Sequence, residues 1–190
     1  MSTLLYAWEF GAALGHVGAF LPLARTLRQR GHEVRWAVSQ TGAAARLLAQ
    51  EDFIWLQAPI CAETPRAGPP LSYNDILLRF GYARNEDLLG LVVAWRELMR
   101  AIGAQAVLAD HAPSAILAAR TLGIPVVLFS SAFCVPPKQR PLPNMRPWIV
   151  LQPGQLDALE DEALASINTV LDHFGQPAFD AVAQLFDVAE

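Results

Sequence analysis

The sequence predicts an α/β protein with a Rossmann-like, doubly wound and mainly parallel sheet that carries helices on both faces. Short apolar segments alternate with amphipathic ones along roughly the first 130 residues. Such alternation builds a parallel sheet, because parallel strands need crossover connections that are usually helical. In addition, the segment 124–129 is purely apolar, as expected for a strand in the middle of a parallel sheet.

The elements follow in order along the chain. A strand at 4–8 leads through a glycine-rich turn into a helix whose apolar positions recur with helical spacing, and a second strand follows at 34–38. Strands joined in this way run parallel with a right-handed crossover. The same rules assign the other segments: a helix at 42–50, a strand at 53–56, a proline-rich loop at 59–70, a helix at 85–102, a strand at 106–109, a helix from 113 to 123, the strand at 124–129, an irregular segment at 134–153 with six prolines, and closing helices at 155–173 and 178–188.

Composition indicates one globular domain over residues 1–190. The chain is 53% hydrophobic and 17% charged, which supplies a core and argues against disorder. Its net charge of −4 disfavours nucleic acid as a main partner, because binding phosphates requires a basic face. The segment 155–190 holds eight acidic residues and no Lys or Arg. Solvated faces of the closing helices would account for these acids, and so would a docking surface for another domain.

Localisation and metal binding can be judged from the same sequence. Cys61 and Cys134 stand alone and match no metal-ligand spacing, so we predict reduced thiols and no metal site. The N-terminus lacks the basic region of a signal peptide, and no stretch is long and apolar enough to span a bilayer. We therefore expect a cytoplasmic protein without a transmembrane segment.

Ligands of open parallel sheets bind beyond the carboxyl ends of the strands. The loop after the first strand contains Gly11, Gly15 and then His16. It is not a dinucleotide-binding motif, because Ala13 stands where the second glycine would be, and no Lys-Ser/Thr pair follows to make a phosphate-binding loop. The loop places His16 near the start of a helix, where it could act as a base or could simply cap or pack.

Asp110 directly follows the apolar strand at 106–109. A carboxylate there costs free energy unless it is paired, so it either caps the next helix or pairs with His16 across the strand ends. In the second case it would fix one imidazole tautomer and stabilise the imidazolium, as in hydrolase triads. No nucleophilic Ser or Cys with its own motif completes a triad, so the dyad would activate a hydroxyl supplied by a substrate. The adjacent His111 either lines the pocket or points elsewhere on the loop.

Two segments of the chain resemble family 1 of the GT-B glycosyltransferases, which includes UDP-glycosyltransferases and macrolide glycosyltransferases. Residues 15–34, GHVGAFLPLARTLRQRGHEV, are similar to the family's opening, G-H-V-N-P followed by L-A-x-x-L-x-x-R-G-H-x-V. Asp110 and the later segment AARTLGIPV at 118–126 resemble the family's second conserved region. One departure is that Gly18-Ala19 replaces the usual Asn-Pro.

The resemblance implies that the chain is the N-terminal, acceptor-binding domain of an inverting glycosyltransferase. It implies that His16 deprotonates the acceptor hydroxyl and that Asp110 orients it. No cofactor is expected in this chain, because the donor nucleotide sugar would be held by a C-terminal domain or a partner subunit; without it the chain would be inactive. The acceptor is expected to be a small molecule, with hydrophobic molecules as candidates, and to contact Phe10, Leu14, Gly15, Tyr82, His111 and Phe133.

Other functions fit parts of the same sequence. A non-catalytic small-molecule-binding or regulatory module could retain this fold, and a neighbouring reading frame for a donor domain would favour the enzyme. A lipid-linked peptidoglycan glycosyltransferase shares the architecture, but it would show Gly-Gly-His where this chain has Leu14-Gly15-His16. A flavodoxin-like or nucleotide-binding module would also match the pattern of strands and helices.

Overall fold

The computed structural model describes residues 1–11, 15–129 and 133–188. Contacts within the chain divide it into two compact units inside the single domain that the sequence predicts. The first unit is built from Met1–Ile60 and Val92–Val135, and the second from Cys61–Leu91 and Pro136–Asp187. Along the described part of the chain, no helix has both the length and the apolar character needed to cross a bilayer.

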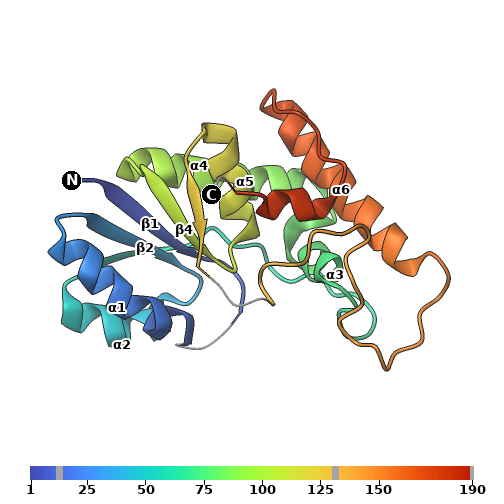
Figure 1. The fold of residues 1–190 in the computed structure, drawn as a ribbon, viewed down its shortest axis with the longest axis horizontal. Helices are drawn as coiled ribbons and strands as arrows, with labels where there is room; N and C mark the ends of the chain where they lie inside the picture. The colour runs from blue at the N-terminus through green and yellow to red at the C-terminus, as the bar shows by residue number, and fades with distance from the viewer. Residues whose placement is uncertain (12–14, 130–132, 189–190) are drawn as a thin grey trace. The chain divides into compact units, whose positions relative to one another are not determined.

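The first unit contains a five-stranded, all-parallel sheet (Figure 1), which confirms the predicted fold class. Its strands in chain order are β1 (Thr3–Trp8), β2 (Glu33–Val38), β3 (Ile54–Gln57), β4 (Ala106–Asp110) and β5 (Val126–Leu128). The spatial order is β3-β2-β1-β4-β5, so β1 lies in the centre. Successive strands are added on one side of β1 up to β3 and on its other side from β4 onward. The residues that end β1 and β4, Trp8 and Asp110, lie opposite each other in the sheet.

One strand position predicted from the sequence is wrong. The apolar segment 124–129 was expected in the middle of the sheet, but β5 is an edge strand that pairs only with β4 and leaves Val127 55% exposed. Apolar composition alone does not distinguish an edge strand from a central one, because either can bury one face against helices. The central strand is β1, which pairs with a neighbour on each side.

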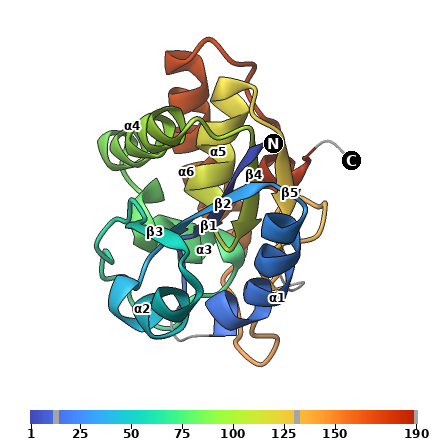
Figure 2. The ribbon, with the colours of Figure 1, turned by 90° about the vertical axis from the view of Figure 1, so that its left-hand side faces the viewer.

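Helices cover both faces of this sheet (Figure 2), as predicted. One face carries α1 (Gly15–Gln29) and α2 (Thr41–Leu48), which continues into a short 3-10 turn. The other face carries α5 (Pro113–Leu122) and the part of α4 (Asn85–Ile102) that belongs to the first unit. Helix α5 begins with Pro113 in its first turn and ends at Gly123, whose φ of 68° is left-handed and therefore suits a glycine cap.

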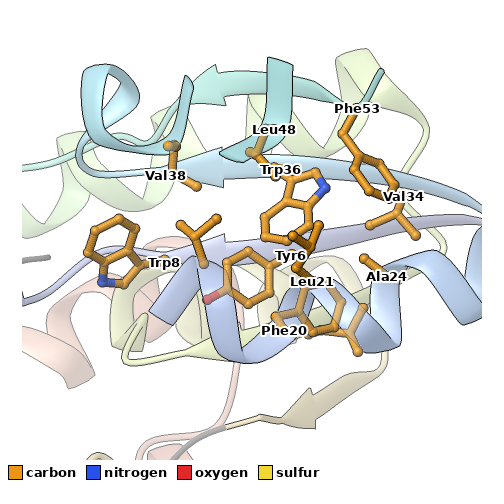
Figure 3. Packing of buried hydrophobic residues seen from close by; sticks show 13 residues of the cluster. Tyr6, Trp8, Phe20, Leu21, Ala24, Val34, Trp36, Val38, Leu48 and Phe53 are labelled. Atoms are coloured by element: carbon orange, nitrogen blue, oxygen red, sulfur yellow. The ribbon is translucent and has the colours of Figure 1, made fainter. Parts of the chain in front are cut away.

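An aromatic core fills the space between the sheet and α1 with α2 (Figure 3). Tyr6 and Trp8 point to the same face because side chains alternate along a strand. The ring of Tyr6 stacks on Phe20 from α1 at 4.4 Å between centroids, and Trp36 from β2 lies against both rings. All four side chains are fully buried. Burial of large rings of this kind dominates core stability, so the first unit is anchored on these aromatics.

The second unit is formed by α3 (Tyr73–Leu77), the π-helical turn η2 (Leu78–Tyr82), α6 (Gln155–His173) and the 3-10 turn η3 (Val182–Phe186). Helix α6 has the predicted bounds, whereas α3 and η2 were missed after the proline-rich loop. Instead of the predicted helix at 178–188, this segment forms only the 3-10 turn η3, whose start Gln184 caps, and Asn168 binds the backbone carbonyl of Phe179 that a helix would use. Asn168 bonds both backbone groups of Phe179, and Gln184 accepts from the backbone of Ala181.

A buried carboxylate ties this second unit together. Glu160 of α6 is fully buried and accepts hydrogen bonds from Asn74 Nδ2 at 2.6 Å and from the backbone N–H groups of Leu142 and Val182 at 3.1 and 2.7 Å. Three separate segments therefore meet on one side chain. From the sequence, the acids of 155–190 were expected on solvated faces or on a docking surface. Glu160 is an exception, because it is fully buried.

Candidate functional site

His16 and Asp110 meet at the carboxyl ends of the central strands. Asp110 is the last residue of β4, and His16 is the second residue of α1. Nδ1 of His16 lies 2.9 Å from Oδ2 of Asp110, at hydrogen-bond distance. The carboxylate side chain is 6% exposed and the imidazole 25% exposed. A buried carboxylate thus holds one ring nitrogen of an imidazole that solvent still reaches.

A second donor reaches the same carboxylate oxygen, and sequence reasoning missed it. The hydroxyl of Tyr6, in the middle of β1, donates to Oδ2 of Asp110 at 2.7 Å. Burial and then the charge of Asp110 raise the pKa of Tyr6 well above its usual range, so the phenol keeps its proton. The available signal was a tyrosine in an otherwise apolar buried strand, since a buried hydroxyl must find a partner.

The imidazole of His16 lies against the end of β1 and the start of the loop that follows it. Trp8 stacks on it at 5.1 Å between ring centroids and donates its own N–H to the carbonyl of Phe10 at 2.6 Å. Gly11 has a φ of 97°, which favours glycine, and a Cβ at this position would lie 3.0 Å from Nε2 of His16. A glycine at this position therefore avoids a side-chain contact with the nitrogen that Asp110 does not hold.

Three of the predicted acceptor-binding residues gather near this imidazole. His111 is 8% exposed, and its ring lies 5.3 Å from Phe10, 5.9 Å from Phe133 and 6.5 Å from His16 between centroids. Burial, with a smaller effect from His16, lowers the pKa of His111 to about 4, so its imidazole is neutral at neutral pH. Phe133 is 54% exposed, whereas Phe10 is buried. The side chains beside His16 thus form an uncharged aromatic wall with one exposed ring.

The other predicted contacts are placed differently. Gly15 is exposed and precedes His16 at the start of α1. Leu14 lies outside the described residues. Tyr82 belongs to the second unit, where its side chain is fully buried. The structure therefore brings Phe10 and Phe133 together on His111, and His111 in turn lies beside His16.

A buried glutamate joins the loops that follow β1 and β4, and sequence reasoning missed it too. Glu9 is 3% exposed and accepts the backbone N–H of Ser114, in the first turn of α5, at 3.0 Å. Glu9 thus fills the helix-capping role that was one of the two alternatives expected for Asp110. Burial raises the pKa of Glu9 to about 8, although its hydrogen bonds to Ser114 favour the ionised form. The backbone of Phe10 also donates to the carbonyl of His111 at 3.0 Å, so the two loops are linked twice.

A surface cavity of about 360 Å³ lies away from this site, beside the turn that leads into β2. His32 and several charged side chains line it. Its arginines already have partners, since Arg28 contacts Glu51 and Arg35 contacts Glu33. Because the cavity contains neither His16 nor Asp110, it contributes nothing to their chemistry.

The chemistry that this arrangement offers is proton transfer. An imidazole held by a buried carboxylate at Nδ1 can accept a proton at Nε2, and the carboxylate then stabilises the imidazolium. Within the described ranges, no three His, Cys, Asp or Glu side chains are grouped so that they could hold a metal ion.

Sequence comparison gives one partial relative. No family model matches the chain. The UDP-N-acetylglucosamine–N-acetylmuramyl-(pentapeptide) pyrophosphoryl-undecaprenol N-acetylglucosamine transferase of Marinobacter nauticus is 34% identical over 93 residues, which are 49% of this chain and 20% of the relative.

Solved structures share the fold over more of the chain. The glycosyltransferase of kitacinnamycin matches 98% of this chain with 43% of its own length, at 20% identity and a TM-score of 0.63. SnogD of Streptomyces nogalater matches 93% with 43% of its length, at 18% identity and a TM-score of 0.54. MurG of Acinetobacter baumannii matches 68% with 35% of its length, at 24% identity and a TM-score of 0.50. The chain thus spans less than half the length of these glycosyltransferases and shares their fold over that part.

Proposed function

We propose that this chain is the acceptor-binding half of an inverting, nucleotide-sugar-dependent glycosyltransferase. The observation that carries the proposal is the contact of 2.9 Å between Nδ1 of His16 and Oδ2 of Asp110, which leaves Nε2 of His16 beside Gly11. This pair lies at the carboxyl ends of β1 and β4, where open parallel sheets bind ligands. The fold shared with GT-B glycosyltransferases supports the reaction class.

In the proposed reaction, the acceptor hydroxyl binds with its proton directed at Nε2 of His16. Nε2 takes this proton while the acceptor oxygen forms a bond to the anomeric carbon of the sugar. The bond from that carbon to the nucleotide diphosphate breaks on the opposite side, which inverts the configuration. Asp110 stabilises the imidazolium that results. General-base assistance of this kind contributes roughly a hundred- to ten-thousand-fold to the rate.

The aromatic wall near His16 supports a hydrophobic acceptor. The exposed ring of Phe133 offers apolar contact area, and the buried, neutral ring of His111 behind it adds no charge. The donor nucleotide sugar would be held by a second domain or a partner subunit, and positioning of the two substrates would supply a further part of the rate. The chain alone is then expected to bind the acceptor and to transfer no sugar.

A lipid-linked acceptor is a second candidate. The relative in Marinobacter nauticus is named for transfer of N-acetylglucosamine to a pyrophosphoryl-undecaprenol-linked acceptor. Leu14 stands where the lipid-linked peptidoglycan glycosyltransferases would have a glycine. The match to this relative means that Leu14 alone does not exclude a lipid-linked acceptor. Hydrophobic aglycones and undecaprenyl-linked acceptors are therefore the two arms of an acceptor panel.

The test is a sugar-transfer assay on the chain joined to the donor-binding domain of a GT-B glycosyltransferase. We expect transfer to one arm of the panel, and His16→Ala should reduce the rate by at least a hundredfold. His173→Ala is the matched control, since this exposed histidine lies at the end of α6. Wild-type rates in His16→Ala would refute the proposed role. Acceptor binding without transfer by any donor fusion would favour a non-catalytic binding module.

A further inference from the structure

Two donors converge on a single oxygen of Asp110. The hydroxyl of Tyr6 approaches Oδ2 to 2.7 Å, and Nδ1 of His16 approaches the same atom to 2.9 Å. Asp110 is 4% exposed, so water has little access to its carboxylate. The direction in which Oδ2 points is therefore set by protein groups, and Tyr6 is one of them.

Tyr6 is itself held rigidly by the aromatic core. Its ring is fully buried, stacks on Phe20 with an interplanar angle of 13° and lies 4.7 Å from the ring of Trp36 between centroids. Figure 3 shows the hydroxyl at the end of a ring enclosed by these side chains. Because a ring packed in this way has one accessible rotamer, the position of its hydroxyl is fixed as well.

The phenol is also a permanent donor. Burial, followed by the charge of Asp110, raises the pKa of Tyr6 well above its usual range, so this hydroxyl keeps its proton wherever the protein is folded. A hydrogen bond to a carboxylate favours its ionised form. Tyr6 therefore opposes transfer of the Nδ1 proton from His16 to Asp110.

We propose that Tyr6 is a positioning residue, which holds Oδ2 of Asp110 toward His16 and so keeps the imidazole proton on Nδ1 and the lone pair on Nε2. This role of Tyr6 rests on the proposed function, because Nε2 must carry the lone pair in order to take the proton of the acceptor hydroxyl. It extends the dyad to three members, of which Tyr6 and Asp110 are buried. The hydrophobic core thus contacts the proposed base directly through the ring of Trp8 and indirectly through Tyr6 and Asp110.

A merely structural hydroxyl would behave differently. If Tyr6 only satisfied its own buried oxygen, removing that oxygen would lower stability and leave the tautomer of His16 unchanged. Tyr6→Phe keeps the ring that stacks on Phe20 and deletes the hydroxyl alone. Tyr73→Phe is the matched control, since Tyr73 is a buried tyrosine of the second unit.

The experiment is nitrogen and proton NMR on the chain labelled with ¹⁵N-histidine, at a pH where the imidazole of His16 is neutral. The signals of His16 are assigned by their loss in His16→Gln. We expect the wild-type protein to show the Nδ1–H tautomer with a slowly exchanging proton. In Tyr6→Phe we expect a mixture of tautomers, an upfield move of the Nδ1 proton signal and faster exchange with water; Tyr73→Phe should match the wild type.

Each result bears on a distinct statement. An unchanged tautomer and Nδ1 proton signal in Tyr6→Phe would overturn the role of Tyr6, and so would a downfield move without faster exchange. An Nε2–H tautomer in the wild type would overturn both this role and the proposed function. If His16→Ala retains transfer while Tyr6→Phe shifts the tautomer, the proposed function fails and the positioning contact stands. In an active fusion, Tyr6→Phe should lower kcat and leave KM unchanged.

Discussion

Glu9→Gln tests how the loops around the proposed site are held together. Burial raises the pKa of Glu9 from 4.5 to about 8, so the folded protein retains a proton that the unfolded chain releases. The stabilisation linked to this proton is fully present below about pH 4.5 and is lost as the pH rises to about 8. At about 1.4 kcal/mol per pH unit, the loss amounts to roughly 5 kcal/mol over this range. Glutamine stays neutral and can still accept the backbone N–H of Ser114.

The assay is urea unfolding of the wild type and of Glu9→Gln between pH 5 and 8, followed by the fluorescence of the buried tryptophans. As the pH rises, the free energy of unfolding of the variant minus that of the wild type should increase by about 1.4 kcal/mol for each pH unit. Glu97→Gln, at an exposed glutamate of α4, is the control and should show no such trend. A difference between Glu9→Gln and the wild type that stays constant with pH would refute the buried, proton-bearing state of Glu9.

Three further predictions concern the site and the second unit. Gly11→Ala should abolish transfer in an active fusion, because the new Cβ would lie 3.0 Å from Nε2 of His16; wild-type kinetics would contradict this. Glu160→Ala should lower the free energy of unfolding of the second unit by about 3 kcal/mol or more, since three buried donors lose their acceptor, and amide exchange at Leu142 and Val182 should accelerate. Phe133→Ala should raise the acceptor KM and leave the melting temperature within error, because this ring is 54% exposed; an unchanged KM would remove it from the acceptor site.

Much of the fold could be predicted because its signals are local. Helices α4 and α6 have the predicted bounds, since long apolar stripes with helical spacing identify them. The contact between His16 and Asp110 could be anticipated because parallel strands place their carboxyl ends together, even though 94 residues separate the two. Local periodicity was sufficient for the helices, whereas the topological rule left the pairing of His16 with Asp110 as one of two alternatives, which the resemblance to GT-B glycosyltransferases then favoured.

The errors and omissions arise where distant residues decide the structure. In place of the predicted helix at 178–188 only the 3-10 turn η3 formed, and Asn168 of α6 binds the backbone carbonyl of Phe179 that a helix would use. Tyr6 reads as an ordinary strand residue and Glu9 as the first residue of a loop, but their partners lie 104 and 105 positions away. Hydrogen bonds of this range follow from the packed fold and leave no periodic signal in the sequence.

Chemical rescue of His16→Ala tests the central claim most directly. In an active fusion, the single-turnover transfer rate of this variant is measured with and without added imidazole. If the ring takes the acceptor proton, the rate should fall by at least a hundredfold and should rise again with imidazole concentration, because the solute can occupy the vacated space and accept the proton. A transfer rate equal to that of the wild type in the absence of imidazole would contradict the claim.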